Sequence, residues 1–251
     1  MNRHLSLRSG NPALKKNTFQ NLAYSETDRM TLEGTVNKTI ISLLILLFTA
    51  SYTYSNGNIN YVLIGFIVGL ILAIITIFKK EWSPYTVPLY AGFEGLALGG
   101  ISFIYASMYT GIVQQAIFLT VGIFSALLFA YKTKIIKVTE NFKLGLFAAT
   151  AGIAIFYLIS MLLRWIGGVD LAFFNPNNEA YGSWMSIGFS LFVVVIASLN
   201  LVLDFDFIEE ASESNVPKYM EWYASFGLLV TLIWLYLEIL RLLAKLYSRR
   251  N

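Results

Sequence analysis

Residues 221–246 read EWYASFGLLVTLIWLYLEILRLLAKL and are apolar over most of their length. At about 1.5 Å of rise per residue, a helix over this range is long enough to cross the ~30 Å hydrocarbon core of a bilayer. The run also contains Glu238, an acid that is costly to expose to lipid. The stretch therefore predicts a transmembrane helix with one face turned toward protein.

Six further apolar runs precede it, at 38–55, 59–78, 85–109, 111–131, 144–165 and 184–208. Hydrophobic residues make up 57% of the 251 residues and charged residues 13%, with a mean hydropathy of +0.63, which leaves too little charge to cover a soluble domain. We expect an all-α integral membrane protein with seven transmembrane helices. Residues 1–37 form a polar N-terminal arm, residues 38–251 form one membrane domain, and no cleavable signal peptide is evident.

The distribution of basic residues predicts the orientation of these helices. The turns SNGN (55–58) and YTG (109–111) are short, so neighbouring helices run antiparallel. Basic residues precede the first run and follow the second and fourth: Arg3, Arg8, Lys15, Lys16, Lys38, Lys79, Lys80, Lys132, Lys134, Lys137 and Lys143. The positive-inside rule places all three regions and the N-terminus in the cytoplasm.

The tail, with Lys245, Arg249 and Arg250, goes against this rule if the seventh run crosses the membrane. A full crossing is favoured because the run is long enough. A re-entrant or late-inserting last helix is the alternative.

Several classes of protein are disfavoured by what the sequence lacks. There is no Cys and a single His, His4, so we expect neither a disulfide framework nor a metal site built from thiolates or histidines. No phosphate-binding glycine loop and no nucleophile with a histidine base is visible, so we expect neither an enzyme nor a cofactor. No basic stripe with interleaved aromatic residues indicates nucleic acid as a partner.

Glu94 lies in AGFEGLALGG (91–100), within the third run. Ala91, Gly95 and Gly99 recur at four-residue spacing, and such a stripe of small residues lets a neighbouring helix approach closely. Glu94 is therefore a candidate ion or proton ligand on a tightly packed helix. Alternatively, it is a carboxyl held neutral or hydrogen-bonded for structural reasons only.

Glu238 has Arg241 three residues further on, close to the same helical face. The two can pair within one helix, which would make them inert packing. An ion pair in lipid still leaves donors and acceptors to satisfy, so this face should also meet polar partners inside the bundle.

Asp204 and Asp206 are two residues apart in LNLVLDFDFIEE (199–210) and point to different sides of a helix. Asn200 lies one turn before Asp204, which favours Asp204 as the inward group. A second acidic cluster follows at i, i+3, i+4 and i+7: Asp206, Glu209, Glu210 and Glu213. This cluster is typical of a solvated helix end, and the alternative is an acidic vestibule that concentrates cations.

Taken together, several motifs resemble the Bax inhibitor-1/YccA family. They are SGNPALKKNTF (9–19), GTVNKT (34–39), EGLALGGIS (94–102), SLNLVLDFDFIEE (198–210) and KYMEWYASFGLLVTLIWLYLEILRLL (218–243). The first and last look like the bacterial YccA-like branch. The resemblance implies a seven-helix bundle with a central last helix, and a pH-sensitive calcium leak gated by acids on the sixth and seventh helices. It also implies association of bacterial members with a membrane-bound AAA protease.

Residue by residue, Asp204 matches the family's acid at the end of the sixth helix, and Glu238 matches the acid of the LYLD-type run, here LYLE. Helix arithmetic places these two acids at different depths, which argues against direct pairing and makes Glu94 a candidate link between them. Lys79 or Lys80 matches a basic group that tethers one aspartate in some relatives.

The leading hypothesis is a proton-regulated cation leak of the bacterial inner membrane, passing calcium, with Asp204, Glu238 and Glu94 on the ion path. Hard cations prefer oxygen ligands, which fits this set. The rival is a non-conducting modulator of a membrane-bound AAA protease that acts through the polar arm. A purely structural bundle is the third possibility.

Overall fold

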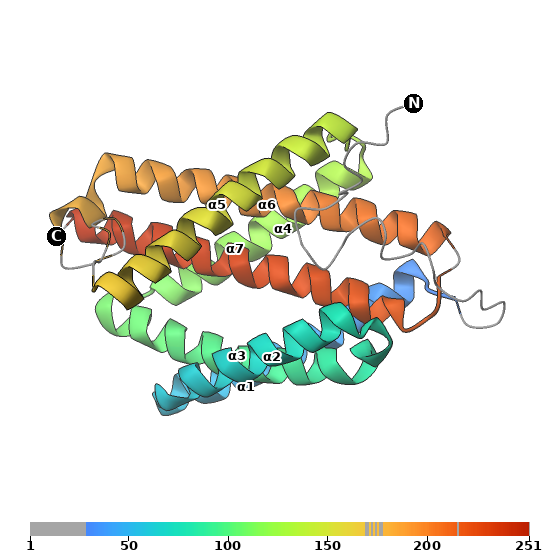
Figure 1. Ribbon diagram of the computed structural model, residues 1–251, viewed down its shortest axis with the longest axis horizontal. Helices are drawn as coiled ribbons and strands as arrows, with labels where there is room; N and C mark the ends of the chain where they lie inside the picture. The colour runs from blue at the N-terminus through green and yellow to red at the C-terminus, as the bar shows by residue number, and fades with distance from the viewer. Residues whose placement is uncertain are drawn as a thin grey trace. The chain divides into compact units, whose positions relative to one another are not determined.

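The computed structural model describes residues 29–168, 171, 173, 175, 178–214 and 216–250, and it contains seven long helices (Figure 1). They are α1 (Leu32–Asn56), α2 (Asn60–Phe78), α3 (Ser83–Met108), α4 (Ile112–Lys132), α5 (Glu140–Gly167), α6 (Trp184–Glu213) and α7 (Met220–Arg250). Two short 3₁₀ helices, η2 (Lys80–Trp82) and η4 (Glu179–Gly182), precede α3 and α6. All seven are long and apolar enough to cross a membrane. The expectation of an all-α protein with seven spans is confirmed.

Each predicted run overlaps one of these helices, and the largest shift is at the start of α1. This helix begins at Leu32, so residues 32–37 of the expected arm are helical. The reason is Thr31, whose side chain accepts a hydrogen bond from the Gly34 N–H at 2.9 Å and caps the helix. Residues 1–28 of the arm, which contain Arg3, Arg8, Lys15, Lys16 and the arm's motif at 9–19, lie outside the described residues.

The two short turns contain glycines in the left-handed conformation, as turns of this kind require. Gly57 ends α1 with φ +61°, and Gly111 precedes α4 with φ +81°. At the other end of the chain, α7 is one unbroken helix of 31 residues. At about 1.5 Å per residue it is roughly 46 Å long, which favours a full crossing over a re-entrant last helix.

The described chain divides into two compact units, and each is treated separately below. The first contains residues 29–110 and 204–230, and the second contains residues 111–203 and 231–250. In the first unit, α3 packs against both α1 and α2 (Figure 1).

Glycines on α3 and α2 account for this close packing. A Cβ added to Gly95 would lie 2.4 Å from the Leu46 carbonyl oxygen of α1, and one added to Gly99 would lie 2.2 Å from that of Ala50. On α2, a Cβ at Gly65 would lie 2.4 Å from the Phe93 carbonyl oxygen. The small-residue stripe therefore does what its spacing predicts: it lets helix backbones touch.

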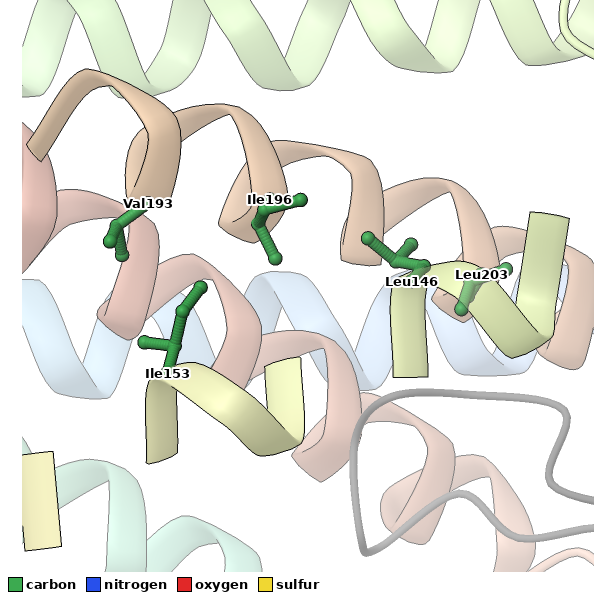
Figure 2. Close-up of a cluster of buried hydrophobic side chains, with 5 residues drawn as sticks. All are labelled: Leu146, Ile153, Val193, Ile196 and Leu203. Atoms are coloured by element: carbon green, nitrogen blue, oxygen red, sulfur yellow. The ribbon is translucent and has the colours of Figure 1, made fainter. Parts of the chain in front are cut away.

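In the second unit, α5 and α6 share a cluster of buried aliphatic side chains (Figure 2). Leu146 and Ile153 of α5 meet Val193, Ile196 and Leu203 of α6. The residues recur at spacings of three and seven, as expected for one face of each helix. This contact positions the polar residues that lie beside it on the same helices.

Burial differs sharply among the helices. In the apolar windows of α6 and α7, 61% of residues are buried, against 17% for α2 and α4. Helix α2 exposes large aliphatic side chains, among them Leu63, Ile67, Leu70 and Ile74. Such a surface suits a lipid environment, and the central position of α7 stays a prediction.

Candidate functional site

In the second unit, Glu238 of α7 lies at the centre of a polar cluster. Its side chain is 2% exposed. Arg241 Nη1 lies 2.6 Å from Oε1 and 2.7 Å from Oε2. The Tyr157 hydroxyl of α5 donates to the same carboxylate at 3.0 and 3.1 Å, and Trp234 Nε1 donates at 3.2 Å. The carboxylate therefore has a counter-charge and neutral donors from two helices.

Tyr157 links the acid and the base of this cluster. Its hydroxyl accepts a hydrogen bond from Arg241 Nη1 at 2.7 Å, and its ring lies 5.1 Å from the guanidinium carbon. The intrahelical pair predicted from the sequence is present, and so are the polar partners expected around it. The sequence did not identify Tyr157 or Trp234, which lie within apolar runs like many other aromatic residues.

Two more cations follow Arg241 on α7 at intervals of four residues. Lys245 is fully buried, with Nζ 3.4 Å from the Ser186 carbonyl oxygen and 5.5 Å from the centroid of the Tyr181 ring. The Arg249 guanidinium carbon lies 3.5 Å from the centroid of the Trp184 ring. Lys245 and Arg249, two of the residues that conflict with the positive-inside rule, therefore lie against aromatic rings, which stabilise cations through their π faces.

Asn200 of α6 adds a polar contact with α5 beside the aliphatic cluster. It is buried, and its Nδ2 donates to Thr150 Oγ1 at 2.9 Å and to the Ile196 carbonyl oxygen at 2.8 Å. Its Oδ1 is buried and has no hydrogen-bond partner among the described residues. A buried acceptor in this state is suited to bind water or a cation.

The part of α6 that belongs to the first unit begins with Asp204, which is 0% exposed. Asp206, two residues further on, is only partly buried. Asp204, the acid that the sequence favoured as the inward group, is therefore the more deeply buried of the two. Of the remaining acidic cluster, Glu210 is half-buried, whereas Glu209 and Glu213 are exposed near the end of α6. Exposure of these acids agrees with a solvated helix end, and the vestibule stays a prediction.

Glu94 of α3 is half-buried and faces α2. A Cβ added to Gly69 of α2 would lie 2.6 Å from Glu94 Oε2, so the missing side chain at Gly69 provides the space for the carboxylate. Gly95 and Gly99 contact the other neighbour, α1. Helix α3 therefore packs tightly against α1 and α2, while the role of Glu94 in an ion path stays a prediction.

Asp204 and Glu94 belong to the first unit and Glu238 to the second. The proposed chain through Glu94 stays a prediction. Lys79 is exposed at the end of α2, and Lys80 Nζ lies 5.7 Å from the centroid of the Tyr223 ring. Their expected role in tethering an aspartate also stays a prediction. No group of three or more acids and histidines close enough to hold a metal occurs in the described ranges.

The first unit also contains an ion pair that the sequence did not reveal. Glu221, at the start of α7, is fully buried and pairs with Lys38 of α1. Its Oε1 accepts hydrogen bonds from the Thr31 N–H and hydroxyl, each at 2.9 Å. The sequence does contain a signal for this pair. Lys38 and Glu221 have opposite charges and begin the first and last apolar runs, and the predicted orientation places the starts of both runs on the same side of the membrane.

A family model described as Bax inhibitor 1 like matches residues 11–248. The chain belongs to the Bax inhibitor 1 like family. The match includes Glu94, Asp204 and Glu238 and nearly all of the membrane-spanning part of the chain. A search of curated proteins gives no match.

The family expected from the motifs is therefore confirmed for this Bax inhibitor 1 like protein, whereas its place in the YccA-like branch stays a prediction. Its seven apolar helices make it an integral membrane protein. Glu238 is paired with Arg241 and bonded by Tyr157, whereas Glu94 lies in a tight contact between α3 and α2.

Proposed function

We propose that this Bax inhibitor 1 like protein is a cation leak that passes calcium and opens or closes as intramembrane carboxylates gain or lose protons. It lies in a bacterial inner membrane with its N-terminus in the cytoplasm, in line with the distribution of basic residues. It belongs to the YccA-like branch, which the motifs at both ends of the chain favour.

The observation that carries the proposal is the complete burial of Asp204 within α6. An ionised carboxylate inside a membrane protein is costly unless it has partners, and its protonation removes that charge. A change of one full charge at a buried position changes which helix contacts are favourable. Asp204 is therefore the gate of the proposed leak.

Glu238 and Glu94 have different roles in this proposal. Glu238 is already bound to Arg241 and Tyr157, so a cation at this point has to compete with a guanidinium for the carboxylate. Glu94 lies against Gly69 of α2, and its carboxylate is the proposed ligand of the cation on the path. Carboxylate and amide oxygens are ligands that calcium prefers.

The test is calcium entry into liposomes that contain the purified protein, followed with an enclosed indicator over a pH series. Wild-type protein should admit calcium in a pH-dependent way, and Glu94→Gln should reduce the flux. Glu238→Gln should alter its pH dependence. Protein-free liposomes are the control. Flux no greater than that of the control at every pH would refute the leak.

A second candidate function is a non-conducting modulator of a membrane-bound AAA protease. It is favoured by the contact of residues 29–31, the end of the arm, with the start of α7, because a partner that binds the arm could act on the membrane domain through this contact. Deletion of residues 1–28 distinguishes the two functions. Loss of a copurifying protease with flux unchanged favours the modulator.

A further inference from the structure

Glu221 joins two parts of the chain that are far apart in sequence. Its carboxylate is fully buried at the start of α7, and its partners come from the N-terminal end of α1. The Thr31 N–H and hydroxyl donate to Oε1 at 2.9 Å, and Lys38 Nζ pairs with Oε2. Thr31 also caps α1, so one residue both starts the first helix and binds the last.

Gly34 makes this arrangement possible. A Cβ at this position would lie 2.1 Å from Glu221 Oε1, and therefore any larger residue would displace the carboxylate. The Lys38 ammonium also lies 5.8 Å from the centroid of the Trp222 ring, next to its partner on α7. The ion pair of Lys38 and Glu221 therefore lies where the N-terminal end of α1 packs closely against the start of α7.

The backbone of the same segment pairs with the connection between α6 and α7. The Met30 N–H donates to the Val216 carbonyl oxygen at 2.8 Å, and Arg29 and Pro217 form an antiparallel bridge. Met30 and Val216 are both buried. Arg29 and Met30 are therefore fixed to this connection, and Thr31 is fixed to the start of α7.

The start of α7 is also held from α3. Ser83 Oγ donates to the Tyr219 carbonyl oxygen at 2.8 Å, and Lys80 lies over the Tyr223 ring. Among these contacts, the one between Glu221 and Lys38 is an ion pair. Removing one partner of a buried pair leaves the other charge uncompensated, so these contacts form and break together.

We propose that Glu221, Lys38, Thr31 and Gly34 form a clasp that couples the N-terminal arm to the C-terminal part of α6, which contains Asp204. Glu221 is its positioning residue. The clasp joins the arm to the connection that directly follows the helix of Asp204, and it holds the leak closed until it is released. The proposal rests on the function proposed above and adds a means by which a partner on the arm regulates it.

Two variants open the clasp in different ways. Glu221→Gln removes the charge, and Gly34→Ala displaces the carboxylate while keeping every charged group. Each should raise calcium flux at a fixed pH by roughly fivefold or more, the lower end of ordinary coupling between sites. Gly152→Ala is the matched control, because a Cβ there would meet nothing within 4 Å. Wild-type flux in both variants would overturn the proposal.

A disulfide separates positioning from folding. The chain has no Cys, so Met30→Cys with Val216→Cys introduces one defined pair, at positions that lie opposite each other in the antiparallel contact. In the Glu221→Gln background, the oxidised pair should return flux to the wild-type level, and reduction should raise it again. Flux that stays high after oxidation would overturn the role of the clasp.

The yield of this disulfide is a readout that does not depend on transport. It should be several-fold lower at equal oxidation times in Glu221→Gln than with Glu221 present. Equal yields would overturn the clasp even if the leak exists. Wild-type protein without flux would refute the leak and the regulation by the arm, whereas the yield would still decide whether Glu221 holds the segment.

Discussion

Arg241 should be essential for stability because it neutralises a carboxylate that is otherwise buried. Its Nη1 bonds both oxygens of Glu238 and the Tyr157 hydroxyl, at 2.6, 2.7 and 2.7 Å. Breaking a buried pair by removing one partner costs roughly 3–5 kcal/mol. Arg241→Met, which keeps an unbranched apolar stem, should therefore lower the free energy of unfolding by about this amount.

The companion variants separate the charge from its neutral partners. Tyr157→Phe removes one hydroxyl that bonds a charged group, which is worth about 1.5–3 kcal/mol. Glu238→Leu combined with Arg241→Met replaces the pair with apolar side chains of similar size. Replacement of this kind is often neutral or stabilising. The double variant should thus be more stable than Arg241→Met alone.

The assay is equilibrium unfolding in mixed detergent micelles, followed by circular dichroism so that changes near Trp234 do not bias the signal. The double-mutant cycle gives the coupling between the two residues directly. A loss below about 1 kcal/mol in Arg241→Met would refute the reasoning, since this is the range of exposed pairs. A double variant whose loss of stability equals the sum of the losses in Glu238→Leu and Arg241→Met would independently contradict the predicted coupling.

Further predictions concern helix packing and alkaline stability. Gly95→Ala should destabilise the protein by about 1–3 kcal/mol because the new Cβ meets the Leu46 carbonyl oxygen, whereas Gly152→Ala should not; unfolding measurements that rank the two equally would contradict this. Burial and the nearby Glu81 raise the pKa of Tyr219, which lies before α7. The folded state then holds this proton more tightly than the unfolded state, so stability should fall as the pH rises through the normal tyrosine range. Tyr219→Phe should lessen that alkaline loss, and unfolding curves that decline as steeply as those of wild type would exclude the effect.

Much of the fold was predictable because its signals lie within single segments. Apolar runs gave all seven helices, and the four-residue spacing of Gly95 and Gly99 predicted the close approach of a neighbouring helix. The start of α1 was misplaced because the cap at Thr31 draws polar residues into the helix. Run length alone does not reveal such a cap.

The candidate site was predictable where partners are close in sequence. Glu238 and Arg241 are one helical turn apart, and their pairing follows from that spacing. Tyr157 is 84 residues from Arg241, and Lys38 is 183 residues from Glu221. Contacts of this kind depend on how helices pack and on which faces meet, and neither is encoded in the periodicity of one helix.

The central claim is that Asp204 gates a cation leak by changing its charge. The most direct test compares calcium flux across a pH series for wild type, Asp204→Asn and Asp206→Asn in liposomes. Asp206 is the matched control because it lies on the same helix two residues away and is partly exposed. Asp204→Asn should abolish the pH dependence of flux, whereas Asp206→Asn should retain it. Full pH dependence in Asp204→Asn would contradict the account.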